Sequence, residues 1–187
     1  KIIASILGNL GEVARLQGDY AAARKFYQES LELAQALGDR QVIASILNNL
    51  GEVARLPGDY VAARKFFQDA LELAQALGDR QVIASILTNL GNVADSQGDY
   101  AAATSYYKDA LVLSKALGAK EVIAKVLWGQ ARVAAKTGRK AEARQLLDQA
   151  IQHFAALRDP ALADALQLRA AVGAPPDPVQ CRKTCDE

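Results

Sequence analysis

The stretch ALGDRQVIASIL at residues 36–47 recurs without a single change at residues 76–87. The flanking residues repeat as well, in four segments that share one pattern: 9–26, 49–66, 89–106 and 129–146. A fixed period of this length is typical of stacked units, each too small to bury its own apolar side chains. The sequence therefore predicts four repeats of 40 residues over residues 1–158. Lys1 falls in the middle of the repeat's register, so we expect a fragment that begins inside a repeat.

Each repeat divides into two halves, because a Gly-Asp pair recurs every twenty residues: Gly18-Asp19, Gly38-Asp39, Gly58-Asp59, Gly78-Asp79 and Gly98-Asp99. Glycine readily adopts the left-handed conformation that ends a helix, and aspartate accepts hydrogen bonds from the free amides that begin the next one. The later junctions weaken to Gly118-Ala119 and Gly138-Arg139, whereas Asp159-Pro160 restores a helix start. Each repeat is thus predicted to form two antiparallel helices of roughly 16 or 17 residues.

The helical periodicity of the second repeat predicts which side chains form the core. On a wheel of about 100° per residue, one side of its first helix carries Ile43, Ile46, Leu47, Leu50, Gly51 and Ala54. The facing side chains of its second helix are predicted to be Ala63, Phe67, Ala70 and Leu77. Because ALGDRQVIASIL is the joint between repeats, its recurrence indicates that neighbouring units dock in the same way.

Several of these positions resemble the signature of the tetratricopeptide repeat. The signature combines a Leu-Gly pair in the first helix with an early Ala in the second, an aromatic residue four positions later and a small residue three after that, here Leu50, Gly51, Ala63, Phe67 and Ala70. The fourth repeat departs from it, with Gln130-Ala131 in place of the pair. The forty-residue length is similar to the long-helix variant of kinesin light chain, spindle-orientation adaptors and bacterial signalling regulators. The resemblance implies an all-α, right-handed α-solenoid of helix-turn-helix repeats that binds proteins and is not an enzyme.

The residues after the fourth repeat predict a different ending. Residues 159–172 are expected to form a helix that caps the last exposed core face, because the end of a solenoid needs a polar outer surface. Residues 173–187 are rich in proline and charge, and we expect a flexible tail there. Cys181 and Cys185 in that tail are expected to be free thiols, since two ligands do not complete a structural zinc site.

Composition narrows the class of protein. The chain is 51% hydrophobic and 23% charged, with a net charge of +1, and no apolar run approaches the roughly 20 residues that cross a bilayer. Two cysteines form no disulfide framework, which favours a reducing, cytoplasmic setting. The single histidine, His153, has no nucleophile or metal ligand beside it at a useful spacing. We expect no catalytic residue, cofactor, metal or membrane contact.

Functional residues are expected on the face of the first helices opposite the core, since similar repeat arrays present that face to a concave groove. The predicted peptide-binding residues on or beside this stripe are Asn9, Glu12, Asn49, Glu52, Asn89, Asn92, Lys125, Trp128, Arg132 and Lys136, with Gly129 also in register. Asparagine is a poor helix former, yet it recurs at one register, and its amide can pair with both donors and acceptors of an extended backbone. In the long-helix relatives, an asparagine at this place resembles one that holds the bound peptide. A solvated polar face is the alternative for the stripe, and an intrahelical ion pair with Arg15 or Arg55 is the alternative for the glutamates.

The charge distribution suggests the chemistry of a partner. Residues 120–145 contain seven basic and two acidic residues, so the rest of the chain is net negative. This polarity predicts a protein or peptide partner with an acidic portion near the fourth repeat, and it argues against nucleic acid. Trp128 either packs a ligand side chain or covers the joint between repeats. The preferred function is a protein-binding scaffold, and the alternative is a ligand-sensing or autoregulatory module of a larger bacterial signalling ATPase or transcription regulator.

Overall fold

The computed structural model describes residues 2–173, and this part of the chain is entirely helical. Its nine helices are α1 (Ile2–Leu16), α2 (Tyr20–Ala36), α3 (Arg40–Arg55), α4 (Tyr60–Leu77), α5 (Arg80–Ser96), α6 (Tyr100–Leu117), α7 (Lys120–Lys136), α8 (Lys140–Leu157) and α9 (Ala161–Gly173). The all-α prediction is confirmed. Cys181, Cys185 and the predicted tail beyond Gly173 lie outside the described residues.

The Gly-Asp junctions form the turns that the sequence predicts. Every junction glycine has a positive φ, such as 68° at Gly78 and 65° at Gly118, where a side chain would be strained. Asp99 then begins α6, its carboxylate accepting a hydrogen bond from the Ala102 amide at 3.0 Å. Helices α7 and α8 follow Ala119 and Arg139, whose side chains form no such cap. The decayed junctions therefore keep the turn and lose the cap.

Three of the four hydrophobic clusters join the two helices of one repeat to the first helix of the next, and the fourth joins α7 and α8 to α9. In one cluster Ala54 of α3, Phe67 of α4 and Leu90 of α5 are buried together. The predicted core of the second repeat is largely confirmed, with Ile43 and Leu47 half-buried. The prediction for Leu77 was wrong: its side chain is 41% exposed, because α4 ends there at the turn.

The paired helices of the first three repeats approach closely at the signature glycine. A Cβ atom added to Gly51 would lie 2.5 Å from the Phe67 ring, and one on Gly91 would lie 2.5 Å from the Tyr107 ring. No real side chain fits at that distance, so the aromatic ring requires glycine opposite it. The fourth repeat has Ala131 at this place and replaces the aromatic residue with Leu147.

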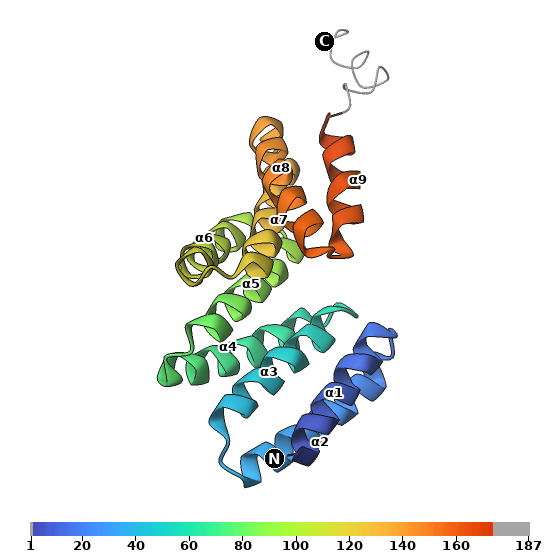
Figure 1. Ribbon diagram of the computed structural model, residues 1–187, viewed down its shortest axis with the longest axis vertical. Coiled ribbons are helices and arrows are strands. Elements are labelled where there is room, and N and C mark those ends of the chain that lie inside the picture. Colours follow the sequence, from blue (N-terminus) through green and yellow to red (C-terminus); the bar gives the residue numbers. More distant parts are fainter. Residues whose placement is uncertain (1, 174–187) are drawn as a thin grey trace.

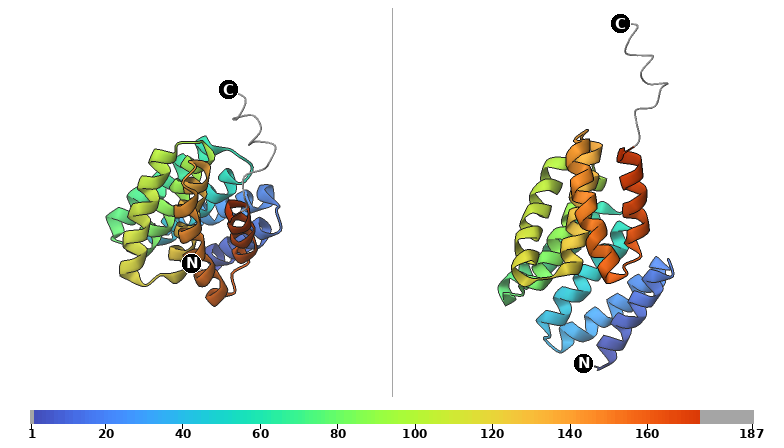
Figure 2. Two further views of the ribbon diagram at one scale, coloured as in Figure 1. Left: turned by 90° about the horizontal axis from the view of Figure 1, so that it is seen from above. Right: turned by 45° about the horizontal axis from the view of Figure 1, so that its top comes forward.

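The helices form two layers. We call α1, α3, α5 and α7 the first helices and α2, α4, α6 and α8 the second helices. Each first helix contacts the next first helix, whereas no two second helices bring their backbones close together within the described residues. The first helices therefore lie on the inside of the right-handed solenoid (Figure 1). Helix α9 packs along α8 at the far end, as both views in Figure 2 show.

Candidate functional site

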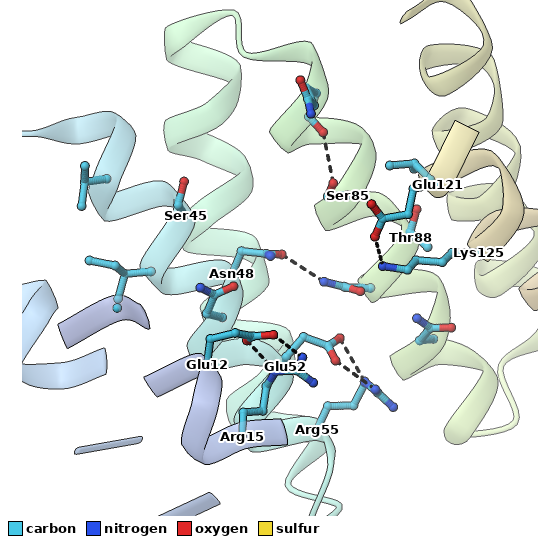
Figure 3. Close-up of a pocket in the computed structure, with 18 of the residues that line it drawn as sticks. Glu12, Arg15, Ser45, Asn48, Glu52, Arg55, Ser85, Thr88, Glu121 and Lys125 are labelled. Atoms are coloured by element: carbon cyan, nitrogen blue, oxygen red, sulfur yellow. Dashed lines mark hydrogen bonds and ion pairs between the residues drawn. The ribbon is translucent and has the colours of Figure 1, made fainter. Parts of the chain in front are cut away.

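The first helices together line a groove of about 1250 Å³. Figure 3 shows polar side chains of α1, α3, α5 and α7 pointing into a common space. Ser30 of α2, Ala161 of α9 and Asp39 in the turn before α3 complete the lining. Small-molecule sites usually measure about 300–1,000 Å³ and are mostly apolar. This groove is larger and lined mainly by polar side chains.

Nine of the ten predicted site residues line this groove: Asn9, Glu12, Asn49, Glu52, Asn89, Asn92, Lys125, Trp128 and Arg132. Lys136 is not part of the lining among the described residues, and its ammonium group lies 2.7 Å from the Asp95 carboxylate instead. Gly129 is also not on the groove. It is buried in the joint, where an added Cβ would lie 2.5 Å from the Tyr107 ring.

Asparagine is concentrated in the groove. The chain has five asparagines, and all five line it: Asn9, Asn48, Asn49, Asn89 and Asn92. Their side chains differ in how far they are already engaged. Within the described chain, Asn9 and Asn49 make no side-chain hydrogen bond, whereas Asn89 Nδ2 donates to Asn48 Oδ1 at 3.1 Å. Two complete carboxamides and parts of the three others therefore make no hydrogen bond within the described residues.

Asn92 has a structural role. Its Oδ1 accepts hydrogen bonds from the Tyr107 hydroxyl at 2.9 Å and from Arg132 at 2.8 Å. In the first repeat the corresponding tyrosine, Tyr27, donates to Glu12 at 3.1 Å. Burial raises the pKa of Tyr107 to about 12, and it raises the pKa of Tyr27 as well. Both phenols therefore stay protonated at neutral pH. Their hydrogen bonds to Glu12 and Asn92 join the groove-lining first helices to the second helices behind them.

The glutamates of the groove are paired within their own helices. Glu12 lies 2.6 Å from Arg15, and Glu52 lies 3.0 Å from Arg55. The Arg15 guanidinium lowers the pKa of the Glu12 carboxyl against the opposing effect of burial. The intrahelical alternative is confirmed for both glutamates. Lys125 is likewise 2.6 Å from Glu121 on the same helix, which leaves few unpaired charges along the groove.

Asp95 is a functional neighbour that the sequence reading missed. Its buried carboxylate pairs with Arg132 at 3.1 Å and with Lys136 at 2.7 Å, both on the next first helix. Asp95 stands where the first two repeats have Arg15 and Arg55, and Arg132 stands where they have glutamates. A comparison of residues forty positions apart shows that the acidic and basic residues have changed places here. This change is the sequence signal that could have predicted an ion pair between repeats.

Trp128 packs within the fourth repeat and also lines the groove. Its ring meets Phe154 edge to face at a centroid distance of 6.1 Å, and the Arg132 guanidinium lies 4.9 Å from the ring centroid. Two buried donors, Trp128 Nε1 and Arg132 Nε, have no hydrogen-bond partner among residues 2–173. The ring of Trp128 therefore packs against α8 of its own repeat while Trp128 also lines the groove, and both expected roles of Trp128 stay predictions.

The described residues contain neither a membrane-spanning helix nor a metal-binding cluster. No helix there is long and apolar enough to cross a membrane. No group of three or more His, Cys, Asp or Glu side chains in residues 2–173 is arranged to hold a metal ion.

Solved structures with a similar fold come from proteins of more than one kind. Aspartyl phosphate phosphatase F from Bacillus subtilis is 16% identical with a TM-score of 0.81, covering 98% of this chain and 48% of that one. A STAND signal transduction ATPase with a tetratricopeptide repeat sensor, from Pyrococcus horikoshii, is 19% identical with a TM-score of 0.72, covering 90% and 26%. BtubC (BKLC) from P. vanneervenii is 21% identical with a TM-score of 0.67, covering 92% and 82%. At these identities the likeness is one of fold, and the chain spans less than half of the first two proteins.

The sequence itself matches a family model. No curated protein sequence matches it significantly. The tetratricopeptide repeat model matches three overlapping stretches, residues 2–76, 42–116 and 82–156, which together cover all four repeats. The chain therefore belongs to the tetratricopeptide repeat family, whose members generally serve as protein-interaction scaffolds.

Proposed function

We propose that the chain is a non-enzymatic scaffold whose groove binds an extended segment of a partner protein. The observation that carries this proposal is the concentration of all five asparagines on the groove. Three of them, Asn9, Asn49 and Asn89, recur at one register on successive first helices. An extended backbone presents donors and acceptors in alternation, and each carboxamide offers both. A row of asparagines therefore holds a peptide by its backbone, with little dependence on its side chains.

Side-chain selectivity has a separate place in the groove. A hollow of about 400 Å³ lies between α3 and α5 and forms part of the groove wall. Six of its eight lining residues also line the main groove, and Asp79 and Val82 are its own. All of its lining residues are polar, apart from Val82. We infer that a small polar side chain of the bound segment enters this hollow while the neighbouring asparagines hold its backbone.

The fourth repeat supports a weaker preference for an acidic portion of the partner. Asp95, Arg132 and Lys136 together carry a net charge of +1, so one cationic group is left uncompensated there. Lys125 is exposed beside Glu121 and can exchange that partner for a ligand carboxylate. Exposed ion pairs contribute only about 0.2–1 kcal/mol, so this preference adjusts affinity and does not create it.

The alternative function is a sensor or autoregulatory module in a larger signalling protein. Its support is the similarity to the repeat sensor of the STAND ATPase, of which this chain covers 26%. Both functions use the same groove. Both also fit a cytoplasmic setting, because the chain has only two cysteines. They differ in the occupant, which is a separate protein for the scaffold and a ligand or an attached catalytic domain for the sensor.

The proposal is tested with peptides selected from a random phage-displayed library on the immobilised chain. Asn49→Ala and Asn89→Ala are each expected to weaken peptide binding in calorimetry by roughly two- to tenfold, the equivalent of one neutral hydrogen bond, at both low and high salt. Lys125→Ala should weaken binding at low salt only, because the exposed charge is screened. Lys65→Ala and Lys108→Ala, on the outer second helices, are the matched controls. Unchanged binding in the asparagine variants together with loss in these controls would place the ligand on the convex face.

A further inference from the structure

One place in the groove lining carries a different side chain in every repeat. The residues at this place, one on each first helix, are Gly8, Asn48, Thr88 and Trp128. Glycine destabilises the interior of a helix, so a glycine there needs a reason. For Gly11 of α1 the reason is close packing, since an added Cβ would lie 2.8 Å from the Tyr27 ring. No such contact explains Gly8.

The space above Gly8 is open and has a polar floor. Apart from its chain neighbours and the backbone of its own helix, only Ser30 Oγ among the described residues would lie within 4 Å of an added Cβ, at 3.9 Å. Ser30 belongs to α2 and lines the groove, whereas the equivalent residues of the other repeats are alanines. Its hydroxyl donates to the Ala4 carbonyl at 2.7 Å. We call this space the Gly8 recess.

The second repeat shows what a side chain at this place does. Asn48 points from α3 toward α5 in Figure 3, and its Oδ1 accepts a hydrogen bond from Asn89 Nδ2 at 3.1 Å. Forty residues earlier the same pair of places holds Gly8 of α1 and Asn49 of α3. Gly8 has no carboxamide, and Asn49 makes no side-chain hydrogen bond within the described residues. The partner that Asn89 has is therefore missing for Asn49.

The third joint between first helices does not need such a partner. Gly129 stands there in place of the asparagine, and the Thr88 hydroxyl donates to Ala84 of its own helix at 2.8 Å. Within residues 2–173, only the joint of α1 with α3 combines an unpartnered carboxamide with open space beside it. Asn49 is half-buried, so water solvates its carboxamide only in part. A hydrogen bond from a ligand would therefore stabilise a complex there.

We propose, on the basis of the proposed function, that an asparagine or glutamine side chain of the bound segment enters the Gly8 recess. Its carboxamide oxygen accepts a hydrogen bond from Asn49 Nδ2, as Asn48 accepts one from Asn89. A primary amide has two donors and an oxygen with two lone pairs, so Asn49 can hold this side chain and the backbone of the segment together. The partner is thereby narrowed to an extended segment with a carboxamide at one fixed place.

The charges around the Gly8 recess favour a neutral side chain over an acidic one. Glu12 and Glu52 stand one helical turn further along α1 and α3, and they pair with Arg15 and Arg55. These two ion pairs carry no net charge. A ligand carboxylate would place a third negative charge beside the two glutamates, whereas a carboxamide adds none.

The test places the missing carboxamide in the chain itself. Gly8→Asn is expected to pair with Asn49 and to close the recess to a ligand. Gly8→Ala is the matched control, because its methyl group fits 3.9 Å from Ser30 Oγ and offers no hydrogen bond. With asparagine selectively ¹⁵N-labelled, the side-chain NMR signals of Asn49 should move far more in Gly8→Asn than in Gly8→Ala.

Peptides selected on the parent chain from a random phage-displayed library are expected to share asparagine or glutamine at one position. Replacing that residue of the peptide by leucine should weaken binding in calorimetry by roughly two- to tenfold, the equivalent of one neutral hydrogen bond. The loss should be the same for the parent and for Gly8→Ala. It should disappear in Gly8→Asn, which should itself bind the unchanged peptide more weakly by a similar factor.

The inference is overturned if the leucine change costs as much affinity in Gly8→Asn as in the parent. It is also overturned if the selected peptides carry acidic or apolar residues, or no preferred residue, at the position that contacts the recess. In these cases a loss of binding in Asn49→Ala would leave the proposed scaffold function standing. A library that yields no groove-binding peptide would count against both.

Discussion

Gly51 and Phe67 show how single residues set the distance between the two helices of a repeat. Because an added Cβ would lie 2.5 Å from the ring, we expect Gly51→Ala to lower the free energy of unfolding by about 1–3 kcal/mol. The fourth repeat has alanine and leucine at these two places, so Phe67→Leu should relieve part of that cost. Urea unfolding of both single variants and the double variant measures the coupling, expected at about 0.5–3 kcal/mol. Additive effects would refute the assigned contact.

Tyr107 gives the fold a sensitivity to alkaline pH. Burial raises its pKa to about 12 from a usual value of 10.0, so the stability that it contributes is complete below pH 10 and is lost as pH rises toward 12. The loss attributable to this residue is roughly 2–3 kcal/mol. In Tyr107→Phe, the free energy of unfolding in urea should fall less between pH 9 and pH 11.5 than it does in the parent. The ring should still fit, because the equivalent residue of the second repeat, Phe67, is buried without a hydroxyl. A fall of equal size in parent and variant would contradict this.

At the scale of residues, the sequence predicted which side chains line the groove better than it predicted which side chains they pair with. The register of the asparagines and glutamates follows from helical periodicity, and these residues do line the groove. Asp95 of α5 pairs with Arg132 of α7, the first helix of the next repeat. The periodicity of a single helix cannot predict a pair between two helices. Lys136 was expected in the groove because it continues the stripe, but its side chain turns to Asp95.

At the scale of helices, the junction before α7 offers a direct test of capping. Ala119 has φ −77° and ψ 77°, close to the −80° and 75° of the capping Asp99, but it lacks a side-chain acceptor. Ala119→Asp is therefore expected to raise the free energy of unfolding by about 0.5–2 kcal/mol, and Asp99→Ala should lower it by a similar amount. Thermal unfolding followed by circular dichroism measures both. A neutral or destabilising Ala119→Asp would show that this turn does not use a side-chain cap.

Helix boundaries were predictable because glycine and aspartate mark each turn chemically. Leu77 shows where periodicity fails: it continues the apolar spacing of α4, yet the helix ends there and the side chain faces solvent. Gly129 shows a second failure, since its place in the stripe suggested the groove and the Tyr107 ring of the preceding repeat covers it. Both depend on the relative placement of helices, which the period alone does not give.

At the scale of the whole molecule, the stacking of the repeats brings side chains from equivalent places on successive helices onto one groove. Each first helix contributes a few polar side chains, and only the contacts between successive first helices bring them onto one groove. The repeat period predicted this architecture, and the asparagines follow it from α1 to α5. The groove's function rests on the claim that these carboxamides contact the partner's backbone.

The most direct test of that claim observes the carboxamides themselves. The chain has five asparagines, so selective ¹⁵N labelling gives five side-chain NH₂ groups that can be followed by NMR as a selected peptide is added. The signals of Asn49 and Asn89 should shift most and saturate at one equivalent of peptide. In a second, uniformly ¹⁵N-labelled sample, the backbone amides of α4 and α6 should stay in place. Unmoved carboxamide signals, together with shifts confined to α4 and α6, would contradict it.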